Sequence, residues 1–251
     1  MITAAGIDHL MNRGWPAAHS TEHDGWLVRR AAGVTLRANS VLPAGAPYDL
    51  GNALDYVETL YQAHGITPSF QISPAAQPTD LDAHLAARGY EIKNPTLVQC
   101  AAVTDVLAAL PMPTVEVNIS PVADDAWMQF WWQNDGRGGP AEQAVARQIL
   151  DRGTALYARI MVDDRIAAIG RLALVDDWSG LYCIAVDPAF RRQGLAQAVI
   201  HNLLHSATTR GIDKVFLSVL ADNTPALALY HRFGFTTVSR YHYRIGVPKN
   251  G

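Results

Sequence analysis

Cysteine is scarce in this chain, with only Cys100 and Cys183 among 251 residues. They lie far apart and lack the short spacings typical of metal ligands, so we expect unpaired thiols, a reducing compartment and no metal site. No apolar run approaches the ~18 residues of a membrane-spanning helix. The N-terminal stretch also lacks the cationic start and apolar centre of a secretion signal. These absences predict a cytoplasmic protein that is not a membrane partner.

An excess of positive charge is also missing. Lysine and arginine number 20 against 23 aspartates and glutamates, for a net charge of −3. A broad nucleic-acid footprint needs a basic surface, so no nucleic-acid partner is expected and any anion site must be local. The glycine patterns of P-loop and dinucleotide-binding proteins are absent as well.

What the sequence does contain is a strand, a turn and a helix between Leu181 and Leu204. Leu181–Val186 has the composition of a buried strand, Asp187-Pro188 ends it, and apolar residues then recur at helical spacing from Leu195. Six residues form the turn and the helix start: Arg191, Arg192, Gln193, Gly194, Leu195 and Ala196. Free N–H groups at a helix start beside two guanidinium groups predict an anion-binding site.

The pattern Arg-x-x-Gly-x-Ala in this turn resembles the acyl-CoA pyrophosphate loop of the GCN5-related N-acetyltransferase (GNAT) superfamily. A second motif, Asn223-Thr-Pro-Ala-Leu-Ala-Leu-Tyr230 followed by Phe233-Gly-Phe, falls one helix and one strand later, where that family has its fourth helix. The resemblance covers residues 111–251 as a fold. It implies an α/β fold with a mixed, mostly antiparallel sheet flanked by helices, and acetyl-CoA (coenzyme A) as the cofactor.

The landmarks of this region recur in the first half of the chain. Pro188, Gly211 and Gly234 have counterparts in Pro43, Gly65 and Gly89, with the same types of element between them. We therefore predict two tandem GNAT-like units, a degenerate one at 1–110 and a catalytic one at 111–251. The first copy has residues 44–51 in place of the arginine-bearing turn, with a proline and an acid, so we expect it to lack the cofactor loop.

The rest of the sequence predicts further elements and connections. We expect a helix in residues 1–20 and strands at 25–30 and 34–42 that turn at Ala32-Gly33, with a linker at 107–121 and a last strand near 239–247. The glycine-rich stretch 134–140 between two helices is a candidate flexible lid, which in the GNAT family borders the acceptor site.

The resemblance assigns roles to particular residues. The main chain of Ile184, Ala185 and Val186 would hold the pantetheine arm and polarise the thioester, while Arg191 to Ala196 would wrap the pyrophosphate. Tyr230 is the candidate catalytic acid, because a phenol is protonated at neutral pH and can donate to the departing thiolate. Asn223 would bridge the cofactor or the strand ends, or would simply cap its helix.

The sequence leaves the general base open among four residues: Glu142, Asp176, Asp177 and His242. Cys183 is expected to be an inert strand residue, and His201 and His205 to lie on a solvated helix face rather than to bind metal.

We therefore expect an N-acetyltransferase that transfers the acetyl group directly from acetyl-CoA to a primary amine on a small molecule or peptide, as a monomer or homodimer. Two alternatives remain at this point. One is a non-catalytic acyl-CoA sensor or scaffold, and the other is an acetyltransferase for a protein N-terminus or lysine.

Overall fold

The computed structural model describes residues 2–136 and 138–246. The chain divides into two compact units. The first unit comprises Met1–Leu97, Leu220–Asp222 and Val238–Gly251, and the second comprises Val98–Val219 and Asn223–Thr237. Within the described ranges, no helix is long and apolar enough to cross a membrane.

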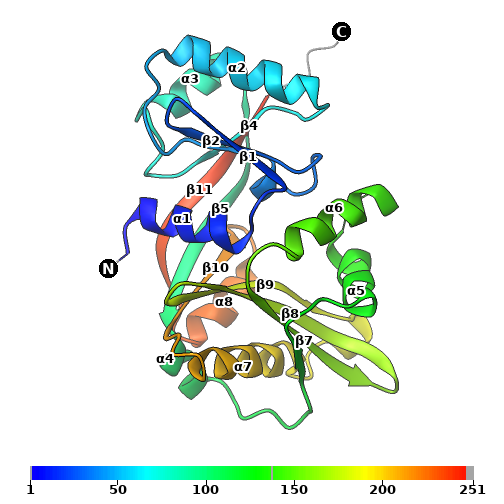
Figure 1. The fold of residues 1–251 in the computed structure, drawn as a ribbon. Helices are drawn as coiled ribbons and strands as arrows, with labels where there is room; N and C mark the ends of the chain where they lie inside the picture. Colours follow the sequence, from blue (N-terminus) through cyan, green and yellow to red (C-terminus); the bar gives the residue numbers. More distant parts are fainter. Residues whose placement is uncertain (1, 137, 247–251) are drawn as a thin grey trace. The chain divides into compact units, whose positions relative to one another are not determined.

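The first unit is a sheet with helices on both faces (Figure 1). Its elements are α1 (Ala4–Gly14), β1 (His19–His23), β2 (Trp26–Arg30), β3 (Val41–Leu42), α2 (Leu50–Ala63), β4 (Ser69–Ile72), α3 (Leu81–Ala87) and the start of β5 (Glu91–Ala102). Trp26 and Phe70 pack in an edge-to-face contact within the core, together with buried residues of α2 and α3. The helical spacing of Ala53, Leu54, Val57 and Tyr61 therefore forms the buried face of α2.

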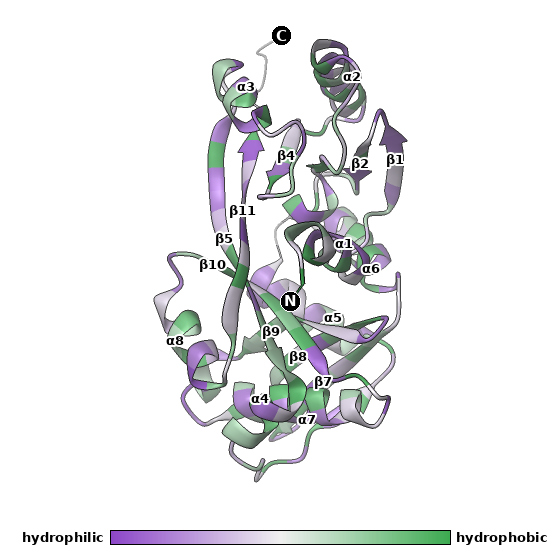
Figure 2. Ribbon diagram, turned by 90° about the vertical axis from the view of Figure 1, so that its left-hand side faces the viewer, coloured by the Kyte–Doolittle hydropathy of each residue, from purple (hydrophilic) through white to green (hydrophobic). Residues whose placement is uncertain are grey.

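The second unit has the same arrangement of layers. Its elements are α4 (Val103–Ala109), β6 (Asn118–Ser120), α5 (Asp125–Asp135), α6 (Pro140–Leu150), β7 (Ala155–Val162), β8 (Arg165–Val175), β9 (Trp178–Val186), α7 (Leu195–Thr208), β10 (Lys214–Leu220) and α8 (Thr224–Arg232). Helix α7 packs against β7, β8 and β9, and α5 contacts β8 and β9. These strands and α7 are largely hydrophobic in Figure 2, as expected for elements buried on both sides or along one face.

Glycine 170 lets α7 lie close to the sheet. A Cβ at this position of β8 would lie 2.5 Å from a methyl group of Val199 and 2.7 Å from the Ile184 Cδ1. Only a residue without a side chain fits there, so the spacing between α7 and β9 depends on it.

The last strand, β11 (Thr236–Ile245), completes the sheet of the first unit. Its residues His242 to Ile245 pair antiparallel with Ile72 to Ser69 of β4, and β11 lies between β4 and β5 in the strand order. The two compact units therefore do not meet at a single boundary between residues 110 and 111, as expected from the sequence, because the end of the chain belongs to the first unit. Residues 98–109 likewise belong to the second.

The expected strands at 25–30 and 34–42 are observed as β2 and β3, which pair antiparallel, Leu27 with Leu42 and Val28 with Val41, but the second strand is shorter than expected. Residues 31–40 form an irregular connection in place of a tight turn at Ala32-Gly33, and β1 adds a further hairpin with β2 through Asp24-Gly25. The cause of the irregular connection is Asn39, whose buried side chain accepts the N–H groups of Ala31 and Gly33 and donates to the Val34 carbonyl. These side-chain bonds satisfy the backbone groups that a strand would otherwise have paired.

Two predicted connections are shorter than expected. The linker 107–121 contains the end of α4 and all of β6, with Pro111 and Pro113 in the segment between them and Pro121 directly after β6. Helix α5 continues through Asp135 and α6 begins at Pro140, where the Glu142 carboxylate accepts the N–H of Gly139. Arg137 and Val247, which belong to the expected lid and last strand, lie outside the described residues.

Candidate functional site

Strand β9 leaves its neighbour β10 halfway along its length. The parallel pairing of the two strands joins Trp178–Leu181 to Lys214–Leu217, although β9 continues to Val186 and β10 to Leu220. Beyond Leu181 the described pairing of β9 is with β8, where Val186 faces Ala168 and Ala185 faces Ile169. Ile184, Ala185 and Val186 therefore have no described strand partner on the side of β9 that faces away from β8.

A bulge accompanies this separation. The register between β8 and β9 shifts between Ile169 and Arg171, and Cys183 adopts a φ of 53°, which is rare for a residue with a side chain. A bulge bends its strand and redirects the peptide groups that follow. Ile184, Ala185 and Val186 lie directly after it and are half-buried.

The turn after β9 is built to start a helix without a side-chain cap. The Asp187 carboxylate accepts the N–H of Ala189 and fixes a short turn over Pro188–Phe190. Arg192 and Gly194 then both have positive φ, at 61° and 78°, which reverses the chain into α7. Gly194 is the N-cap residue of α7 and offers no side-chain acceptor to the helix N–H groups.

Arg191 and Arg192 flank this helix start and are exposed to solvent. Neither guanidinium takes part in an ion pair or hydrogen bond with another described residue. The uncapped N–H groups carry the positive end of the helix dipole, and the two arginines add full charges beside it. These N–H and guanidinium donors have the chemistry that binds a pyrophosphate, and in the sequence they come directly after the end of β9.

The corresponding helix of the first unit, α2, has a negatively charged cap at its start, unlike α7. Helix α2 is capped by Asp49, whose carboxylate accepts the N–H of Asn52 at 3.0 Å. A carboxylate of the protein therefore already occupies the place that a phosphate would take.

Tyr230 and Asn223 lie on α8, which follows β10 in the second unit. Tyr230 is partly buried and packs edge-to-face on Phe235, with ring centroids 5.6 Å apart, and burial raises the pKa of its hydroxyl. Asn223 is the N-cap of α8, and its Oδ1 accepts the N–H of Ala226 at 3.2 Å. The side chain of Asn223 thus serves as a cap, and a contact with the cofactor stays a prediction.

The four candidate bases are spread over the chain. Asp177 pairs with Lys214 and precedes β9, so about 30 Å of extended strand separates it from Val186. Asp176 occupies the same turn. Glu142 caps α6, and His242 is in the first unit, where its Nε2 lies 2.8 Å from Asp82. Asp176 and Asp177 thus lie at the opposite end of β9 from Val186.

Some features of this region carried no signal in the sequence. The bulge is centred on a cysteine rather than a glycine, so its positive φ could not be read from residue type. Arg171 is buried on β8, with its guanidinium 5.9 Å from the Tyr157 ring and 5.4 Å from the Tyr182 ring.

The rings of His201 and His205 stack on α7, and no group of three potential metal ligands is found among the described residues.

A strand that separates from its neighbour at a bulge and leads into an uncapped helix start, within a second copy of the same α/β unit, is the arrangement of tandem GNAT acyltransferases. Acetyltransferases of this fold generally use acetyl-CoA. The chain belongs to the family described as "Probable histone acetyltransferase Rv0428c C-terminal", whose model matches residues 5–244.

Individual relatives agree with this assignment. The uncharacterized N-acetyltransferase YobR of Bacillus subtilis is 28% identical over 246 residues, which is 95% of this chain and 97% of YobR. The [Ribosomal protein bS18]-alanine N-acetyltransferase of Salmonella typhimurium is 39% identical over 90 residues, 35% of this chain and 61% of that enzyme. A solved tandem GNAT protein from the clavulanic acid biosynthesis pathway superposes with a TM-score of 0.66 at 16% identity, covering 99% of this chain and 91% of its own. The protein is an acyltransferase with the tandem GNAT fold.

Proposed function

We propose that the second unit transfers an acetyl group from acetyl-CoA directly to a primary amine. The observation that carries this proposal is the continuity of the open end of β9 with the uncapped start of α7. One segment of chain thereby offers main-chain groups for an extended amide-containing arm and N–H donors for a pyrophosphate.

In this proposal, acetyl-CoA supplies an acyl group already activated as a thioester. The main chain of Ile184, Ala185 and Val186 holds the pantetheine arm, and one of these N–H groups stabilises the negative charge that develops on the carbonyl oxygen. Arg191, Arg192, Gln193, Gly194, Leu195 and Ala196 bind the pyrophosphate. No acyl-cysteine is needed, because both reactants lie in one site.

Tyr230 is the proposed acid. Burial raises the pKa of its hydroxyl, which keeps the phenol protonated at neutral pH. A protonated hydroxyl can donate its proton to the CoA thiolate that leaves when the amine nitrogen forms its bond to the acyl carbon. The proton that the nitrogen loses as it becomes an amide then returns through solvent to the Tyr230 phenolate.

The first unit is proposed to take no part in cofactor chemistry. Asp49 caps the helix start that corresponds to α7, and Pro47 precedes it without an N–H to donate. A negatively charged cap at this position repels a phosphate, so the first unit contributes structure or other binding instead.

The acceptor is proposed to be a small-molecule amine or a peptide. The ribosomal-protein alanine acetyltransferase, by its name, modifies an alanine, so peptides with free N-termini belong in the test together with lysine peptides and small amines.

The test is a thiol-release assay with acetyl-CoA and each acceptor, with the acetylated product identified by mass spectrometry. We expect release of CoA that depends on one class of amine. Slow hydrolysis that no amine accelerates would contradict the proposed transfer.

A further inference from the structure

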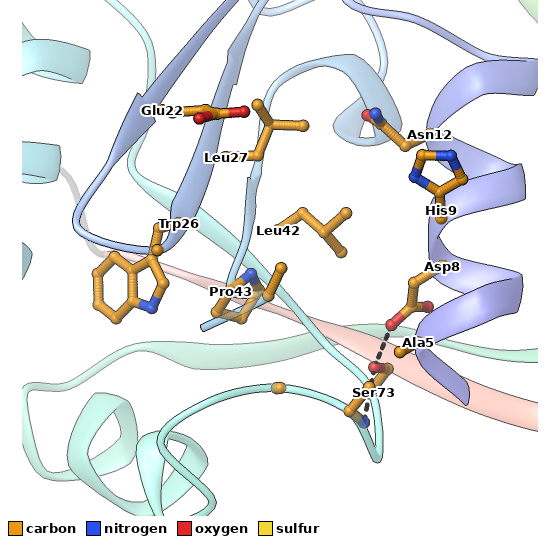
Figure 3. Close-up of a pocket in the computed structure, with 14 residues that line it drawn as sticks. Ala5, Asp8, His9, Asn12, Glu22, Trp26, Leu27, Leu42, Pro43 and Ser73 are labelled. Atoms are coloured by element: carbon orange, nitrogen blue, oxygen red, sulfur yellow. Dashed lines mark hydrogen bonds between the residues drawn. The ribbon is translucent and has the colours of Figure 1, made fainter. Parts of the chain in front are cut away.

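The first unit contains a cavity of about 360 Å³ between α1, the β1–β2 hairpin, the end of β3 and the segment after β4. Figure 3 shows side chains of α1 on one side of it and those of β2 and β3 on the other. Small-molecule sites have volumes of roughly 300 to 1,000 Å³, so the cavity has room for a small organic ligand. It is separate from the proposed acetyl-CoA site, since every residue that lines it belongs to the first unit.

A buried carboxylate lies in the wall of this cavity. Asp8 of α1 is only 5% exposed, and its Oδ2 accepts a hydrogen bond from the Ser73 hydroxyl. Its other oxygen, Oδ1, is buried without a hydrogen-bond partner among the described residues. An unpaired buried carboxylate oxygen is costly, and such groups are uncommon in native proteins.

The nearest cation does not satisfy Asp8. Arg29 of β2 is fully buried, but its guanidinium donates to the Ser40 carbonyl, the Ser40 hydroxyl and Gln71, with a longer contact to Asn12. No hydrogen bond or ion pair joins it to Asp8 in the described part of the chain. Its charge acts on Asp8 only at a distance, and burial still raises the pKa of the Asp8 carboxyl to about 6.

The remaining lining has a clear chemical character. Glu22 of β1 adds a second carboxylate, His9 and Asn12 of α1 add polar groups, and no lysine or arginine among the described residues lines the cavity. Trp26, Leu27, Leu42 and Pro43 supply an apolar surface. Two acids over an apolar floor complement a molecule that combines a positive charge with a hydrocarbon body.

We propose that this cavity binds a small organic molecule with a primary ammonium group, which pairs with the Asp8 carboxylate in the cavity wall while its apolar part lies against Leu27, Leu42 and Trp26. Glu22 at the exposed side attracts the cation. The positive charge of the ammonium offsets the cost of burying the Asp8 carboxylate. The site is independent of acyl transfer in the second unit.

The test uses three probes of similar shape: benzylamine, benzyl alcohol and benzoate. Each is titrated calorimetrically into the full-length protein, without acetyl-CoA. We expect benzylamine to bind at least about tenfold more tightly than benzyl alcohol, and benzoate not to bind. Asp8→Asn should weaken benzylamine binding about tenfold, and Glu22→Gln by a smaller factor.

Two further variants make the outcome decisive. Ala5→Trp adds bulk from the exposed α1 side of the cavity and should abolish binding, whereas Glu116→Gln, an exposed acid in the second unit, should leave it unchanged. Circular dichroism checks that each variant folds. The proposal would be overturned by any of three results. These are equal affinity for benzylamine and benzyl alcohol, no binding of benzylamine at millimolar concentration, and benzylamine affinity that is unchanged in both Glu22→Gln and Ala5→Trp.

Discussion

At the scale of single residues, the two proposals depend on two side chains with raised pKa values. Tyr230 is a partly buried phenol in the second unit, and Asp8 is a buried acid in the first. Burial raises the pKa of both groups and so favours their protonated forms. For Tyr230 this supports a role as proton donor, whereas for Asp8 it makes folding depend on pH.

Tyr230→Phe should lower turnover about 10²-fold while leaving CoA affinity within about twofold, because general acid catalysis contributes roughly 10²–10⁴. The ring contact with Phe235 does not need the hydroxyl, so stability should change little. Steady-state kinetics and calorimetry separate the two effects. Equal turnover would show that Tyr230 is a packing residue.

Asp8 should make the protein less stable as the pH rises from about 4 to 6. An acid whose pKa is raised in the folded state binds more protons there than in the unfolded chain, so the free energy of unfolding falls through this window. The pKa rises from 3.8 to about 6, which corresponds to a loss of about 3 kcal/mol by pH 7. Asp8→Asn should remove this loss in urea unfolding followed across pH. A variant with the same pH slope as the parent would refute the pKa shift.

At the scale of elements, the site depends on how β8, β9 and α7 approach one another. Gly170 leaves room for the side chains of Val199 and Ile184, and the bulge at Cys183 follows the last pair of β9 with β10 at Leu181. The strand, turn and helix between Leu181 and Leu204 were predictable because apolar periodicity and turn residues are local signals. The bulge was not, since its positive φ is imposed by the surrounding sheet on a residue that has a side chain.

Gly170→Ala tests this packing. The added Cβ would lie 2.5 Å from a Val199 methyl group, and overpacking of this kind costs about 1–3 kcal/mol. We expect lower stability and weaker CoA binding, since Ile184 must move. Gly139→Ala is the matched control, because its Cβ would meet only a Glu142 oxygen at 3.6 Å. Thermal unfolding in which both variants behave alike would contradict the account.

At the scale of the whole molecule, the two units do not follow one another in the sequence, because the end of the chain belongs to the first unit. The duplication was visible in the sequence because Pro43, Gly65 and Gly89 match landmarks one unit later. The partner of the last strand was not, because pairing between β11 and β4 joins residues about 170 positions apart and leaves no local pattern. The loop around Asn39 could not be predicted either, because hydrogen bonds of the Asn39 side chain hold it instead of strand pairing.

Removal of β11 should therefore disrupt the first unit, although it is the last element of the chain. A chain that ends at Phe235 loses the pairs of His242 to Ile245 with β4, and the contacts of Arg244 with Asp82 and the Tyr90 carbonyl. Hydrogen exchange should show loss of protection in β4 and α3. A chain that ends at Gly246 keeps all of β11 and serves as the control. Retained protection in the shorter chain would contradict the strand assignment.

The central claim is that the start of α7 in the second unit binds the cofactor, and calorimetry of CoA binding tests it most directly. Gly194→Val places a β-branched side chain at a φ of 78° in the turn, whereas Gly211→Val creates the same backbone strain at a φ of 73° beyond the other end of α7. We expect Gly194→Val to abolish binding and Gly211→Val to retain it. Wild-type affinity in a folded Gly194→Val protein would contradict the claim.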